Sequence, residues 1–122
     1  MESNNPREIV HAYLDAIEGG DFDRARGYLS DEQFVYRSPI FNYDSADEFI
    51  IDIARVGAIL ERIERRRSFA DGDEVCDVLR FVTSWSKPTS TDVVHWSKVK
   101  DGKITLIEAI FDARGYREMF EH

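Results

Sequence analysis

Three turn signals in the second half of the chain constrain its fold most strongly. Each is a short pair of turn-forming residues, at Asp71-Gly72, Lys87-Pro88 and Asp101-Gly102. They separate four extended segments, which run over 59–69, 74–85, 91–99 and 104–111. Extended segments joined by such turns are typical of hairpins, so the sequence predicts a four-stranded antiparallel meander. Segments of about ten residues are long for strands, so this sheet must twist and curve, and its concave face needs a filling.

The first half of the chain predicts helices that can pack against this concave face. Asn5 is a capping residue, Pro6 suits a first helical position, and Gly19-Gly20 ends the pattern, which predicts a helix over 6–18. A shorter helix is expected from Asp21 to about residue 29, a strand over 33–37, and a third helix from the capping residue Ser45 to about residue 57. A short closing helix is expected over 114–120. The expected fold class is therefore α+β, in the order α-α-β-α-β-β-β-β.

Composition narrows the classes of function. The chain has 122 residues, which fits one domain over 1–122, and 43% of them are apolar. The net charge of −8 disfavours nucleic acid and anionic membranes as partners. Cys76 is the only cysteine, and no apolar run approaches the roughly 20 residues that span a bilayer. A cytoplasmic location is the expectation, and no weight is placed on the terminal His122.

Three stretches of the sequence resemble a known superfamily. They are VHAYLDAIEGGD at 10–21, DVVHWSKV at 92–99 followed by DGKI at 101–104, and Phe111-Asp112 at the end of the last strand. Together with the order of elements, they resemble the nuclear transport factor 2-like superfamily, in the SnoaL-like branch that includes polyketide cyclases and ketosteroid isomerases. The resemblance implies a cone-shaped curved sheet around about three N-terminal helices, an enclosed pocket for a small hydrophobic molecule, and often a homodimer.

The resemblance also singles out Tyr13 and His95 as candidate catalytic residues. In the isomerases a tyrosine at the position of Tyr13 and a protonated acid at the position of His95 donate hydrogen bonds to a substrate oxyanion. A phenol and an imidazole can both donate such bonds, and an imidazole can also act as a base. The alternative for each is a core residue that contacts only the protein.

The other expected ligand contacts follow from strand alternation and from the helix faces. Alternation places His95 and Ser97 on one face of their strand. In the preceding strand, Arg80 would share the pocket face with Val78 and Val82, but a register shifted by one residue puts Arg80 outside. The full expected set is Tyr36, Ser38, Phe49, Ile53, Val78, Arg80, Val82, Ser97 and Phe111.

Ser38 is the main departure from the isomerase pattern. The isomerases carry their catalytic aspartate immediately before a proline at this point, and a serine cannot shuttle a proton as that carboxylate does. The sequence therefore disfavours a ketosteroid isomerase. Asp112 and Glu108 are other candidate bases, with a turn cap and a solvent-facing side chain as the expected roles. The three histidines lack the spacing of a zinc site, so neither a metal nor a cofactor is expected.

Three functions remain open from the sequence. The first is an enzyme that uses Tyr13 and His95 for isomerisation, cyclisation or dehydration of a small hydrophobic substrate. The second is a module that binds such a molecule without changing it. The third is a homodimer formed through apolar side chains of the convex sheet face, with Trp85, Trp96, Leu106 and Ile110 as the expected contacts.

Overall fold

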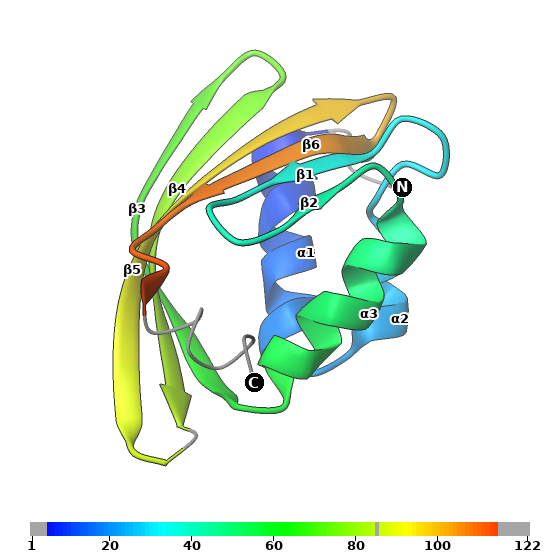
Figure 1. The fold of residues 1–122 in the computed structure, drawn as a ribbon. Helices are drawn as coiled ribbons and strands as arrows, with labels where there is room; N and C mark the ends of the chain where they lie inside the picture. Colours follow the sequence, from blue (N-terminus) through cyan, green and yellow to red (C-terminus); the bar gives the residue numbers. More distant parts are fainter. Residues whose placement is uncertain (1–4, 85, 115–122) are drawn as a thin grey trace.

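The computed structural model describes residues 5–84 and 86–114, which form three helices and one six-stranded sheet (Figure 1). The helices are α1 (Pro6–Glu18), α2 (Phe22–Gly27) and α3 (Ala46–Gly57). The strands are β1 (Val35–Arg37), β2 (Asn42–Tyr43), β3 (Leu60–Asp71), β4 (Glu74–Ser84), β5 (Pro88–Lys100) and β6 (Lys103–Ile110). Trp85, His122 and all but the first residue of the helix expected over 114–120 lie outside the described residues. None of the described helices is long and apolar enough to cross a membrane.

The predicted helix caps are confirmed. The side chain of Asn5 accepts hydrogen bonds from the backbone N–H groups of Arg7 and Glu8, at 3.0 and 3.3 Å. Ser45 caps α3 in the same way by accepting from Glu48 N at 3.3 Å. These bonds satisfy N–H groups that have no partner inside the helix, and they fix where each helix begins.

The sheet has the strand order β2-β1-β6-β5-β4-β3. Strands β3 to β6 form the predicted antiparallel meander. Beside this meander, β1 pairs with β6 in parallel, so the sheet as a whole is mixed. The structure adds β2, a two-residue strand that pairs with β1 and that the sequence did not predict. Turn residues reveal hairpins between consecutive strands, but β1 and β6 are far apart in the sequence and no turn signal relates them.

The sheet curves around α1 and α3, which fill its concave side (Figure 1). The pairing register shifts twice between β3 and β4 and once between β5 and β6. Such bulges increase the local twist and bend the strand. Strand β3 lies at the edge of the sheet and exposes Arg65, Arg66 and Arg67, whose charges disfavour edge-to-edge association with another sheet.

Gly57 lies where α3 packs on α2, and it provides a test of this contact. A Cβ atom at Gly57 would overlap the ring of Phe22, whereas a Cβ atom at Gly27 would meet nothing within 4 Å. We expect Gly57→Ala to lower the free energy of unfolding by about 1–3 kcal/mol, because the Phe22 ring must shift. Gly27→Ala is the matched control. Equal stability of the two variants in urea denaturation would contradict this packing.

Candidate functional site

A cavity of about 80 Å³ lies between the concave face of the sheet and the helices. A second cavity of about 60 Å³ adjoins it. Because five residues line both, we treat the two as lobes of one pocket and call them the inner and the outer lobe. The shared residues are Tyr36, Phe49, Ile53, Val56 and Phe111. Either lobe exceeds the roughly 10–15 Å³ that one water molecule needs.

Two helix faces and several strands of the sheet position the lining of the inner lobe. Helix α1 contributes Tyr13, Leu14 and Ile17, which recur at helical spacing on its buried face. Helix α3 contributes its own stripe at Phe49, Ile53 and Val56. The strand residues that complete the lobe come mainly from β4, β5 and β6, and they are Phe81, Val93, His95 and Ala109. The lining is therefore mostly apolar, with few polar atoms.

The structure brings Tyr13 and His95 together in the lining of the inner lobe. Their ring centroids are 6.2 Å apart, with the rings 26° from parallel. Both residues are buried, at 3% and 4% exposure. Strand alternation on β5 places Val93, His95 and Ser97 on the buried face, as predicted. The catalytic roles of Tyr13 and His95 stay predictions.

Burial keeps both of these groups uncharged at neutral pH. It lowers the pKa of His95 from 6.5 to about 4, against the opposing charge of Asp77. It also raises the pKa of Tyr13 well above its ordinary value of 10. Nδ1 of His95 lies 3.2 Å from Oγ of Ser97, which leaves Nε2 as the ring nitrogen for a ligand. A ligand here would meet a neutral phenol and a neutral imidazole.

Of the other expected contacts, four line the inner lobe and one lines the outer lobe. Tyr36, Phe49, Ile53 and Phe111 line the inner lobe, and Ser38 lines the outer lobe. The ring of Tyr36 stacks on Phe49 at 4.4 Å between centroids, and burial raises the pKa of Tyr36 to about 12. Ser97 is fully buried and contacts His95 rather than either lobe.

The expected pocket contacts from β4 need correction, because the strand presents its other face. Arg80 lies on the convex side, where its Nε donates to Asp92 Oδ1 at 3.0 Å. Val78 is on the same side as Arg80, and neither Val78 nor Val82 lines either lobe. The buried face carries Val75, Asp77 and Leu79 instead. Both faces of β4 are similarly apolar, so alternation alone could not choose between them.

Ser38 and Asp112 have structural partners. Oγ of Ser38 accepts from the N–H groups of Ile40 and Phe41, at 3.2 and 3.1 Å, and donates to the carbonyl of Phe41 at 3.0 Å. Ser38 therefore closes a turn. Asp112 accepts from the backbone N–H and the guanidinium of Arg114, and this partner lowers the pKa of Asp112 to about 2. Asp112 therefore has the structural role that the sequence favoured, whereas the sequence had placed Ser38 only among the ligand contacts.

Sequence reasoning missed two polar features of the site. Asp77 is buried behind His95 on the neighbouring strand, and it lies 2.9 Å from Nε2 of His11 on α1. At the outer lobe, the hydroxyl of Tyr43 donates to Asp52 of α3, and Asp52 also pairs with Arg55 at 3.1 Å. The sequence did contain a signal for Asp77, because it is an acidic residue among the alternating apolar residues of a strand. A carboxylate at such a position is costly to bury without a partner.

The convex face of the sheet is partly covered by its own contacts. Nε1 of Trp96 donates to Glu74 at 3.0 Å, and Nζ of Lys98 lies 5.5 Å from the centre of the Trp96 ring. Ile110 on the same face is 55% exposed. The homodimer through Trp96, Leu106 and Ile110 stays a prediction.

One family model matches most of the chain. A family model described as a SnoaL-like domain matches residues 10–107. The fold is similar to that of an NTF2-like protein of unknown function from Cytophaga hutchinsonii, with a TM-score of 0.82 at 17% identity over 94% of this chain and 96% of that one. A search of curated proteins gives no significant match.

Two further solved structures have the same fold. One is an LEH-like epoxide hydrolase from M. tuberculosis, with a TM-score of 0.77 at 24% identity over 88% of this chain and 83% of that one. The other is a protein with a ketosteroid isomerase-like fold from Catenulispora acidiphila in complex with trimethylamine, with a TM-score of 0.73 at 16% identity over 84% and 83%. At these identities the likeness shows a common fold.

Proposed function

The chain belongs to the SnoaL-like domain family, and from this premise we propose that its pocket binds a small, uncharged, mainly apolar molecule. The observation that carries the proposal is the pairing of Tyr13 with His95 in the lining of a mostly apolar cavity. Apolar walls favour a hydrocarbon body, and a few placed polar groups orient it. The polar group of this ligand would be a carbonyl or hydroxyl that contacts Tyr13 and His95.

The electrostatics of the site favour a neutral ligand over a charged one. With a pKa of about 4, His95 is an uncharged imidazole at pH 7, and burial keeps Tyr13 protonated. Neither residue offers a full charge to balance an ionic ligand, and an unpaired buried charge is costly. A carbonyl oxygen can instead accept from the Tyr13 hydroxyl at little desolvation cost.

Acid/base conversion of the bound molecule is the second candidate function. His95 is unprotonated at neutral pH, so it has a lone pair for a ligand proton. Its low pKa makes it a weak base, however, and general bases work best with a pKa near the operating pH. Binding is therefore the function that the geometry supports best, and catalysis needs a means of raising the basicity of His95.

The proposal can be tested with two probes of nearly the same shape, acetophenone and ethylbenzene. Only acetophenone has a carbonyl, so we expect it to bind more tightly by up to about tenfold, the value of one hydrogen bond. Tyr13→Phe and His95→Phe should each reduce this preference. Binding can be followed by NMR titration of backbone amides. Recovery of a changed product after long incubation would favour the catalytic candidate.

Tyr28→Phe provides the matched control for the loss of a phenol hydroxyl. Tyr28 is partly buried against the core but lines neither lobe. Its variant should keep the full preference for acetophenone. Equal affinity of the wild-type protein for both probes would contradict the assigned role of Tyr13 and His95, and binding of neither would contradict the pocket itself.

A further inference from the structure

Asp77 is a buried carboxylate behind the cavity wall with only one of its two oxygens paired. The residue is 1% exposed. Its Oδ1 lies 2.9 Å from Nε2 of His11, whereas Oδ2 is buried and has no hydrogen-bond partner among residues 5–84 and 86–114. A buried acceptor without a partner is rare in native proteins and costs free energy. Its presence beside a candidate site calls for a functional explanation.

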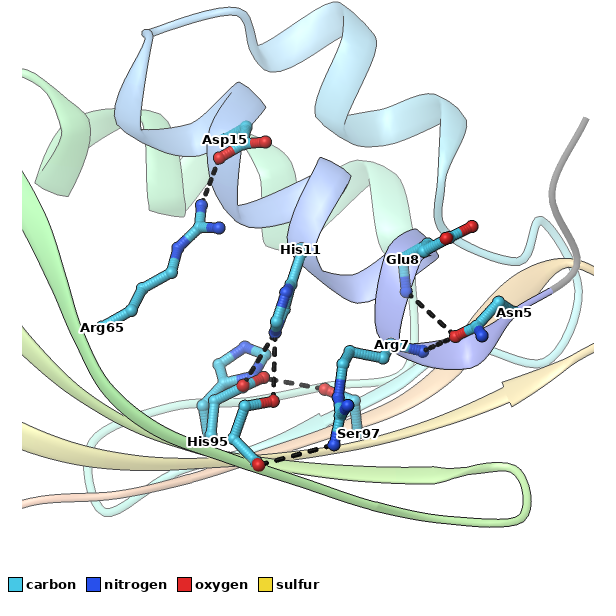
Figure 2. Close-up of polar contacts among 10 residues, drawn as sticks. Asn5, Arg7, Glu8, His11, Asp15, Arg65, His95 and Ser97 are labelled. Carbon is cyan, nitrogen blue, oxygen red and sulfur yellow. Dashed lines mark hydrogen bonds and ion pairs between the residues drawn. The ribbon is translucent and has the colours of Figure 1, made fainter.

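His11 connects this carboxylate to the outside of the protein. It extends from α1 toward the sheet, where its Nε2 also lies 3.2 Å from Oγ of Ser68 (Figure 2). The side chain of His11 is 27% exposed, and that of Asp77 is 2% exposed. When His11 carries a proton, it supplies the positive charge that a buried carboxylate requires. Asp77 thus has a charge partner that solvent can reach.

His95 is the second titratable group close to Asp77. The two residues are paired in register on β4 and β5, and both lie on the buried face of the sheet. Burial is the main cause of the low pKa of His95; the negative charge of Asp77 favours the protonated form of His95, and a proton on His11 would disfavour it. Asp77 is therefore close to two imidazoles, that of His95, which faces the pocket, and that of His11, which is partly exposed to solvent. Its negative charge can stabilise a proton on either ring.

The other charged groups around His11 are paired elsewhere. On α1, Arg7 donates from Nη2 to the carbonyl of Ser68 at 3.5 Å. Asp15, one turn after His11, forms an ion pair with Arg65 of β3 (Figure 2). From β4 and β5, the groups that face His11 are Asp77 and His95. Tyr13 faces His95 from α1.

We propose that Asp77 and His11 are positioning residues that set the protonation of His95 from behind the cavity wall. Asp77 favours an imidazolium toward the pocket, and a proton on His11 opposes this effect. The pair would thereby set the pH at which the imidazole that faces the pocket takes up a proton. The proposal deepens the proposed function, since it concerns the polar end of the same pocket, but its test needs no ligand.

The test is an NMR titration of the histidine rings in the unliganded protein. In His11→Gln, the amide can still donate to Asp77 but carries no charge, so the pKa of His95 should rise. In the double variant His11→Gln/Asp77→Asn, this rise should disappear. In Asp77→Asn alone, His95 should stay neutral down to a lower pH than in the wild type. A role in packing alone would not produce shifts of opposite direction.

Asp15→Asn is the matched control, since it removes one carboxylate from the exposed side of the same helix. It should leave the titration of His95 unchanged. The proposal is overturned if His11→Gln leaves the pKa of His95 unchanged or lowers it, or if the double variant keeps the rise. If Asp77→Asn fails to fold, the change in the pKa of His95 in His11→Gln still tests the proposal. Failure of acetophenone to bind would count against the proposed function and not against this coupling.

Discussion

Phe49→Ala is expected to lower the free energy of unfolding by about 3–5 kcal/mol. The Phe49 ring is 2% exposed and is the centre of the aromatic cluster between α3 and the sheet. Its centroid lies 4.4 Å from that of Tyr36, 5.3 Å from that of Phe34 and 6.0 Å from that of Tyr43. Truncation removes all of these contacts and leaves a void beside a cavity that already exists, so the surrounding side chains cannot fill it.

Urea denaturation of the wild type and the variant measures this loss. Ile51→Ala is the control on the same helix, because Ile51 is 61% exposed and its truncation should change stability by at most about 0.5 kcal/mol. Phe49 also lines both lobes, so the variant should join them into one larger pocket. A loss below about 1 kcal/mol would mean that the cluster packs differently from the structure.

The sequence predicted the helices well because their ends carry local signals. Asn5 and Ser45 each accept hydrogen bonds from backbone N–H groups within three residues. The residue that fixes the start of each helix is therefore next to that helix in the sequence. The hairpins of the meander were predicted for the same reason, since Asp101 and Gly102 adopt the positive φ angles that their turn requires. Short-range chemistry therefore accounts for most of the fold.

Long-range pairing limited the prediction of the sheet and the site. Both faces of β4 carry charge among apolar neighbours, with Glu74 and Arg80 on one face and Asp77 on the other. The alternation of apolar residues does not distinguish these two faces. Which face of β4 is buried depends on partners in other strands and helices. Arg80 finds Asp92 on β5, and Asp77 finds His11, 66 residues away on α1. Helical spacing gave no sign of that contact.

His95 was predicted on the correct face because the resemblance added what alternation lacked. Its environment was not predicted, since the low pKa arises from burial in the folded chain and from charges on α1 and β4. The sequence could name the polar groups of the pocket, Tyr13 and His95, and it could not tell that both are uncharged at neutral pH. That charge state is the reason why the small hydrophobic ligand expected from the sequence is proposed to be a neutral one.

Acidification from pH 7 to pH 4 is expected to destabilise the fold by roughly 3 kcal/mol through His95 alone. The pKa of His95 is about 4 in the folded chain and 6.5 in its ordinary state. The unfolded chain therefore binds a proton first as the pH falls. The contribution of the neutral imidazole is fully present above pH 6.5 and is lost progressively between pH 6.5 and pH 4.

His95→Gln isolates this effect, because glutamine does not titrate and the other ionisable groups are retained. Urea denaturation at pH 7, 5.5 and 4 should show that the wild type loses more stability than the variant, with most of the difference arising below pH 6. If the two lose stability in parallel, His95 is not held neutral by burial. The ligand would then meet a cation at the end of the pocket, and the preference for an uncharged molecule would no longer follow. The acid stability of the unliganded protein thus tests the electrostatic premise on which the choice of ligand class rests.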